Sequence, residues 1–120
     1  MDRKEYLETL GRVIDAKDSK GFASYITENG IFKFGNNEPV VGREAIRDYV
    51  ANFFSVIKSS EHKVINFWEQ NNTVIWQGEV AYTRLDDKKV TVCFVNIFSM
   101  QDELIKEYLI YIDNSPLFQA

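Results

Sequence analysis

The sequence is poor in the residues that build metal sites and disulfides. Its 120 residues include one cysteine, Cys93, and one histidine, His62. A single cysteine cannot form a disulfide within the chain, which fits a reducing compartment, and we expect a cytoplasmic protein. One histidine and one cysteine lack the paired ligand spacing of a zinc site, so we expect no metal and no cofactor.

Long apolar runs and clustered positive charge are also missing. No stretch approaches the roughly 20 apolar residues that cross a membrane, and no apolar segment of a signal peptide follows residues 1–5. Lysine and arginine number 14 against 18 acidic residues, and the net charge is -4. Because the basic residues are spread along the chain and form no patch that could neutralise phosphates, we expect neither nucleic acid nor a membrane as a partner.

Apolar residues, by contrast, are plentiful. The chain is 45% hydrophobic and 14% aromatic. A chain of this length can bury one core without help from disulfides or metals, and no linker or change in composition divides it. The sequence therefore predicts a single domain over residues 1–120.

The first half of the chain has helical patterns. Apolar residues recur at helical spacing in three segments, the second of which begins at a capping residue, Asp18, and ends at a Gly30 stop signal. A small hairpin with Gly and Asn at its turn separates the last two. The predicted helices are residues 3–16, 18–30 and 42–59, and the predicted hairpin strands are residues 31–34 and 38–41.

The second half reads as an antiparallel meander of four strands, because short turns rich in Asn and Asp separate its apolar runs. The predicted strands are residues 62–69, 73–85, 89–100 and 104–113. Strands this long usually coil or bulge, and Gly78 is the expected place. The predicted fold class is α+β, with three N-terminal helices and a small hairpin packed on a strongly curved antiparallel sheet.

Three stretches carry a resemblance to a known family: residues 25–32, residues 41–46, and residues 105–113 with the following 114–117. With the order of the elements, they resemble the SnoaL-like, ketosteroid-isomerase-like branch of the nuclear transport factor 2-like superfamily over nearly the whole chain. The resemblance implies a cone-shaped, cystatin-like roll around an apolar pocket. Members include isomerases, cyclases, dehydratases, epoxide hydrolases and non-enzymatic binding proteins, so the fold does not name the reaction.

The catalytic set of the ketosteroid isomerases is largely missing from the matching positions. By resemblance, Asn96 stands at the family's protonated aspartate and Lys33 or Phe34 at its base. Leu10 stands at the tyrosine that holds the oxyanion. Asn96 could donate a hydrogen bond to a carbonyl, but no base beside it could abstract a proton. This comparison argues against the isomerase mechanism.

Two residues are candidates for acid–base chemistry, Asp113 and His62. Asp113 matches the last aspartate of the limonene-epoxide-hydrolase-like members, whose other two positions hold Asn96 and Phe94 here. It could instead cap the turn at residues 114–115, as carboxylates at strand ends often do. His62 is suited to proton transfer near neutral pH, or it could lie partly exposed at a strand start, because the sequence fixes no carboxylate beside it.

Aromatic residues alternate along the predicted strands and indicate a pocket on the concave face, although the same rings could fill the core. We expect the pocket to be lined by Tyr25, Phe34, Trp68, Trp76, Phe94, Asn96, Phe98 and Tyr111. The apolar residues of the outer face suggest a homodimer, and they are Ile75, Ala81, Cys93, Val95 and Ile97. A register error of one residue would exchange the two faces.

Three functions remain open at this point. The first is a SnoaL-like protein that binds a small apolar or aromatic molecule without catalysis. The second is an isomerase, cyclase or dehydratase of the same fold that acts on an aromatic or polyketide-like substrate. The third is a dimeric module for protein interaction.

Overall fold

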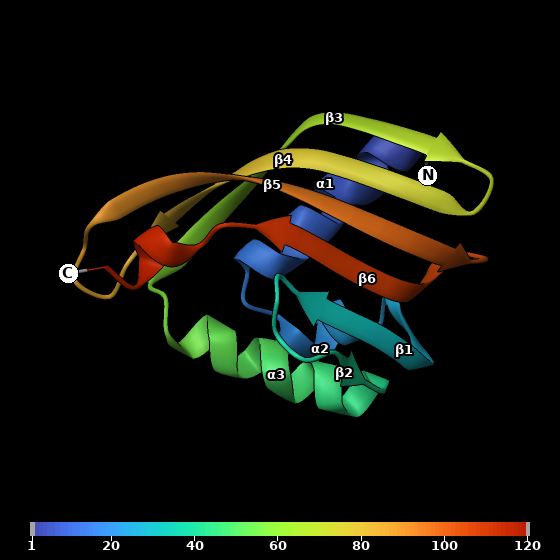
Figure 1. The fold of residues 1–120 in the computed structure, drawn as a ribbon, viewed down its shortest axis with the longest axis horizontal. Helices are drawn as coiled ribbons and strands as arrows, with labels where there is room; N and C mark the ends of the chain where they lie inside the picture. The colour runs from blue at the N-terminus through green and yellow to red at the C-terminus, as the bar shows by residue number, and fades with distance from the viewer. Residues whose placement is uncertain (1, 120) are drawn as a thin grey trace.

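The computed structural model describes residues 2–119, which form a six-stranded curved sheet with three helices on one face (Figure 1). The α+β class predicted from the sequence is confirmed. The helices are α1 (Arg3–Asp15), α2 (Ser19–Ala23) and α3 (Arg43–Ser55), followed near the end of the chain by the 3-10 turn η1 (Ser115–Leu117). The strands are β1 (Ile26–Phe34), β2 (Val40–Val41), β3 (Ser59–Gln70), β4 (Thr73–Thr83), β5 (Lys89–Gln101) and β6 (Leu104–Ile112).

The order of strands across the sheet is β2-β1-β6-β5-β4-β3. The predicted meander and the predicted hairpin are both present as antiparallel pairs. One pair departs from the antiparallel prediction, because β1 lies parallel to β6. Between β1 and β6 the chain passes through β2, α3, β3, β4 and β5, so the first and last strands become neighbours in the sheet.

The second predicted helix is wrong over its second half. Asp18 does cap α2, since its Oδ1 accepts a hydrogen bond from the backbone N of Gly21 at 2.8 Å, but the helix ends at Ala23. Strand β1 then begins at Ile26, which pairs with Ile105 of β6. Pairing with a distant strand overrides the local helical spacing here.

A bulge bends the sheet opposite Gly78. Val64 of β3 pairs with Gly78, and the next paired residue is Asn66, so Ile65 is the extra residue. A Cβ on Gly78 would lie 2.4 Å from Cζ of Phe94, which explains why the position holds glycine. Because an extra residue reverses the inside–outside alternation, the inner face of β3 continues after the bulge on odd-numbered positions.

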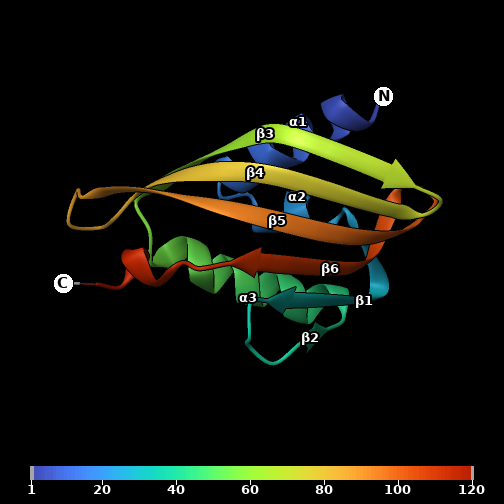
Figure 2. The ribbon, with the colours of Figure 1, turned by 45° about the horizontal axis from the view of Figure 1, so that its top comes forward.

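The two faces of the sheet are in different environments. The inner face packs on α1, α2 and α3 and holds most of the core, including Trp76 and Phe98. Figure 2 shows the helices behind the sheet, with no helix over the outer face. Within residues 2–119, no helix is long and apolar enough to cross a membrane.

Candidate ligand pocket

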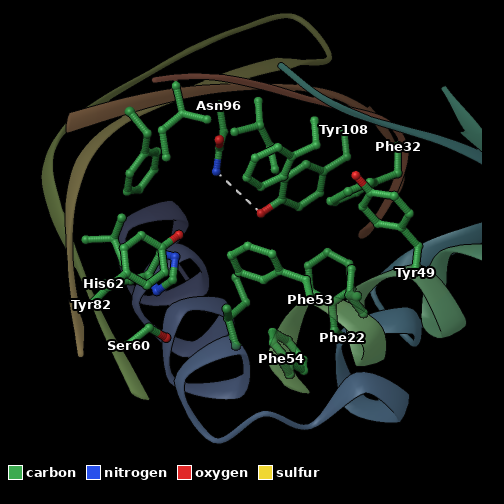
Figure 3. A pocket seen from close by; sticks show the side chains of 17 residues that line it. Phe22, Phe32, Tyr49, Phe53, Phe54, Ser60, His62, Tyr82, Asn96 and Tyr108 are labelled. Carbon is green, nitrogen blue, oxygen red and sulfur yellow. Dashed lines mark hydrogen bonds between the residues drawn. The ribbon is translucent and has the colours of Figure 1, made fainter. Parts of the chain in front are cut away.

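A cavity of about 60 Å³ lies between the inner face of the sheet and the helices (Figure 3). Its aromatic lining residues come from both sides, and they are Phe22, Phe32, Phe34, Tyr49, Phe53, Phe54, Tyr82, Phe94 and Tyr108. The lining described here includes no lysine, arginine, aspartate or glutamate. Binding sites for drug-sized molecules usually have about 300–1,000 Å³, so a ligand that fits this space without moving its walls must be compact.

Asn96 is the only buried polar residue of the described core, with 3% of its surface exposed. It lies in the middle of β5 and points into the cavity (Figure 3). Its Nδ2 donates a long hydrogen bond of 3.4 Å to Oη of Tyr108. Its Oδ1 has no hydrogen-bond partner among residues 2–119. A buried acceptor without a partner costs about 1–3 kcal/mol, so this amide oxygen is unfavourable for folding alone.

Two tyrosine hydroxyls share the pocket wall with Asn96. Burial raises the pKa of Tyr108 far above its usual range, and burial together with the charge of Asp15 does the same for Tyr82. Both side chains are therefore neutral phenols near neutral pH. Each presents a hydroxyl group that can donate and accept a hydrogen bond inside a largely apolar space.

His62 forms a close pair with Asp15, a residue at the end of α1. The distance from Nδ1 of His62 to Oδ1 of Asp15 is 2.6 Å, and the backbone N of His62 donates to Oδ2 at 2.8 Å. The hydroxyl of Ser60 also donates to Asp15, at 2.8 Å. Three hydrogen bonds thus fix the carboxylate beside the imidazole, and the imidazole lines the pocket.

The Asp15 carboxylate is ionised and orients the imidazole. Burial works against its charge, but the hydrogen bonds and charge of His62, with the hydrogen bond from Ser60, hold the pKa of Asp15 below its usual range. A carboxylate only accepts hydrogen bonds, so Nδ1 of His62 carries a proton in the charged and in the neutral imidazole alike. In the neutral imidazole the lone pair therefore lies on Nε2, which is the arrangement of a general base.

The structure brings part of the predicted site together. Phe34, Phe94, Asn96 and His62 all line the cavity. Trp76 and Phe98 lie on the same inner face, but both are fully buried in the core and outside the lining of the cavity.

Three other predicted pocket residues lie elsewhere. Trp68 is 50% exposed and Tyr111 is 56% exposed, both on the outer face. The bulge at Ile65 turns Trp68 outward, and Tyr111 pairs with the outward-facing Val95. Tyr25 packs edge-on against the ring of Tyr6, with ring centroids 5.5 Å apart, and does not line the cavity.

Asp113 lies at the surface, outside the lining of this cavity. Its Oδ1 accepts a hydrogen bond from the backbone N of Ser115 at 3.0 Å, and this bond lowers the pKa of Asp113. The geometry is that of the turn cap weighed above as the alternative to a catalytic role.

The predicted site did not include Asp15, nor did it include Tyr108, Tyr82 or the rings of α2 and α3 that line the cavity. Asp15 is the missed residue that holds the histidine. No spacing along the chain connects it to His62, because the two residues meet only when α1 packs on β3. One local signal was available. An acidic residue in the last turn of a helix faces the negative end of the helix dipole, so Asp15 occupies a position that is unfavourable without a partner.

Replacing Asp15 with asparagine is expected to lower the free energy of unfolding by about 1–3 kcal/mol at pH 7, because the charged hydrogen-bond network is lost. The folded pKa of Asp15 is lowered, so its contribution is present above about pH 4 and is lost as pH falls through the folded pKa. Urea denaturation at pH 7 and pH 3 should show the difference between wild type and variant shrinking in acid. Asp102→Asn, in an exposed turn, is the control, and a difference that does not change with pH would contradict the account.

Comparison with known proteins identifies the family. A family model described as a SnoaL-like domain matches residues 5–108. The chain belongs to the SnoaL-like domain family. No curated protein matches its sequence.

Solved structures with the same fold have low sequence identity to this SnoaL-like chain. A protein with a ketosteroid isomerase-like fold from Catenulispora acidiphila, in complex with trimethylamine, has a TM-score of 0.86 at 12% identity, covering 94% of this chain and 88% of its own. A protein provisionally named a SnoaL-like polyketide cyclase from Jannaschia sp. CCS1 has a TM-score of 0.77 at 20% identity, with coverages of 98% and 94%. An epoxide hydrolase from M. tuberculosis has a TM-score of 0.78 at 12% identity, with coverages of 95% and 84%. At these identities the similarity establishes the fold alone.

Proposed function

We propose that this SnoaL-like protein binds a compact, largely apolar small molecule in the cavity between its sheet and helices. The observation that carries the proposal is the Oδ1 atom of Asn96, a residue of the cavity lining; this atom is buried and has no partner among residues 2–119. Folding alone gains nothing from such an atom, whereas a ligand with a hydrogen-bond donor would satisfy it.

The size and lining of the cavity support a compact ligand. Aromatic rings line most of its wall and favour an apolar body. The neighbouring structure from Catenulispora acidiphila holds trimethylamine, a molecule of similarly small size. A fused-ring polyketide would require rings on α3, such as Phe53 and Phe54, to move away from the sheet.

Replacing Asn96 with leucine separates a binding role from a structural one. If Asn96 serves the ligand, the variant keeps or raises the free energy of unfolding, by up to about 1–2 kcal/mol, because an unpaired buried acceptor is removed. Affinity for a compact ligand that donates a hydrogen bond should fall in the same variant. Thermal unfolding and NMR titration measure the two effects. Lower stability with unchanged affinity would show that Asn96 is structural.

A second candidate function is proton transfer on the bound molecule, supported by the Asp15–His62 pair. The pair supplies an oriented imidazole at the wall of an apolar cavity, which suits an isomerase, cyclase or dehydratase of this family. The test uses small ketones and aldehydes that bind the protein, incubated in deuterated water. His62 should accelerate deuterium incorporation, and His62→Gln should remove the acceleration. Equal exchange rates for both proteins would exclude this function.

We also propose that two copies associate through the outer face of the sheet. Ile65, Trp68 and Tyr111 are large hydrophobic residues on this face, each about half exposed, and Ile65 and Tyr111 border one shallow groove. Burying such residues favours association. Light scattering should give the mass of a dimer for wild type and of a monomer for Trp68→Glu. A monomeric wild-type protein at high concentration would overturn the dimer.

A further inference from the structure

Inside the cavity, Asn96 and Tyr108 leave two complementary hydrogen-bonding functions unused. Oδ1 of Asn96 is an acceptor without a donor within residues 2–119. Oη of Tyr108 accepts from Nδ2 of Asn96, but no acceptor for its own proton is found in the same part of the chain. The free acceptor and the free donor therefore belong to two residues that both line the cavity and are joined by a hydrogen bond (Figure 3).

We propose that Asn96 and Tyr108 form a subsite for one hydroxyl group of the ligand, so that the ligand is a compact alcohol or phenol. This proposal rests on the proposed binding function and names the chemical class of the ligand. The hydroxyl oxygen would accept the proton of Tyr108, and the hydroxyl proton would go to Oδ1 of Asn96. With the existing bond from Asn96 to Tyr108, the three groups close a ring of hydrogen bonds in which every donor has an acceptor.

Other polar groups fit the pair less well. A carbonyl oxygen would accept from Tyr108 but leave Oδ1 of Asn96 unpaired. An ammonium group would donate to Asn96 but leave the Tyr108 proton unpaired. A carboxylate would bring a negative charge into a cavity whose described lining has no lysine or arginine to balance it. Among these groups, only the hydroxyl satisfies both the acceptor of Asn96 and the donor of Tyr108.

The surroundings of Tyr108 hold its hydroxyl in place. The side chain is fully buried, and its ring stacks obliquely on Phe98 and Phe32, with centroids 4.4 Å and 5.1 Å away. Burial also keeps the phenol protonated by raising its pKa. A phenylalanine at this position would keep the ring contacts and remove only the hydroxyl, so Tyr108→Phe is a selective test.

The test compares three probes of matched size: 2-propanol, acetone and 2-chloropropane. NMR titration gives a Kd for each probe with wild type, Tyr108→Phe and the control Tyr82→Phe, which removes another hydroxyl from the same cavity. The preference of wild type for 2-propanol over 2-chloropropane should fall about tenfold in Tyr108→Phe, as expected for one or two hydrogen bonds. The preference should persist in Tyr82→Phe. Acetone should bind wild type more weakly than 2-propanol.

The possible failures are distinguishable. If all three probes bind but the preference is the same in wild type and Tyr108→Phe, the hydroxyl subsite is wrong and the binding pocket stands. If no probe shifts the resonances of the cavity residues, the proposed binding function fails and the subsite fails with it. Should Tyr108→Phe not fold, Asn96→Leu serves as the second variant, and it must lose the same preference.

Discussion

Replacing Trp76 with alanine is expected to lower the free energy of unfolding by about 3–5 kcal/mol, the range for removing a large aromatic side chain from a core. Trp76 is fully buried in β4. Its ring packs edge-on against Phe94 and Phe98, with centroids 5.1 Å and 6.5 Å away, and lies 6.1 Å from the ring of His62. Without the indole ring, a void would lie behind the cavity wall, and His62 would lose one of the rings that it packs against. Urea denaturation at neutral pH measures the effect.

The other tryptophan provides a matched control. Trp68 is half exposed on the outer face, so Trp68→Ala should change the free energy of unfolding of the monomer by less than about 1 kcal/mol. The difference between the Trp76→Ala and Trp68→Ala variants tests the strand register directly. Trp76 and Trp68 lie on opposite faces of the sheet only if the bulge at Ile65 is present. Similar losses for both variants would contradict the assignment of the faces.

Replacing Gly78 with valine is expected to cost about 3 kcal/mol or more, because the added side chain has no room. The first added carbon would lie 2.4 Å from Cζ of Phe94 and 2.5 Å from the backbone O of Lys63. The phenyl ring could turn, but the backbone oxygen is held in the strand, so the bulge and the wall of the cavity would have to shift. The loss should appear as a lower midpoint in chemical denaturation.

Ala81→Val is the control for Gly78→Val. Ala81 lies in the same strand but is exposed on the outer face, where valine is a favourable strand residue. We expect little change in the midpoint. If Gly78→Val were as well tolerated as Ala81→Val, the close approach of β3, β4 and β5 at the bulge would be incorrect.

Elements with strong internal periodicity could be predicted from the sequence. The helix at residues 3–16 and the four long strands have the regular apolar spacing of an amphipathic element, and all are present with small changes at their ends. The helix expected to continue to Gly30 failed because β1 gains its stability from pairing with β6, some eighty residues further along the chain. Local spacing carries no information about such a partner.

The sequence predicted the residues of the candidate site correctly only in strands whose register it also predicted correctly. Phe94 and Asn96 lie in β5, where alternation is unbroken, and both line the cavity as expected. Trp68 follows the bulge in β3, where one extra residue reverses the faces. Asp15 was missed because its contact with His62 exists only after helix α1 has packed on the sheet.

Asn96 links the stability of the fold to the proposed binding of a ligand. The neighbouring inward positions of β5 are apolar, and an apolar residue would also fill this one. The buried amide leaves an acceptor unpaired, a cost of about 1–3 kcal/mol to the empty protein. A bound hydroxyl would recover that cost, so ligand binding should also raise the thermal stability of wild type more than that of Asn96→Leu.

The most direct test of the central claim, a cavity that binds a compact ligand, is a crystal structure of the protein soaked in 2-propanol. The account predicts an open cavity with the alcohol in hydrogen-bond contact with Oδ1 of Asn96 and the hydroxyl of Tyr108, and with the Asp15–His62 pair intact beside it. A cavity closed by the rings of Phe53 and Phe54, with Oδ1 of Asn96 bonded to another group of the protein, would contradict it.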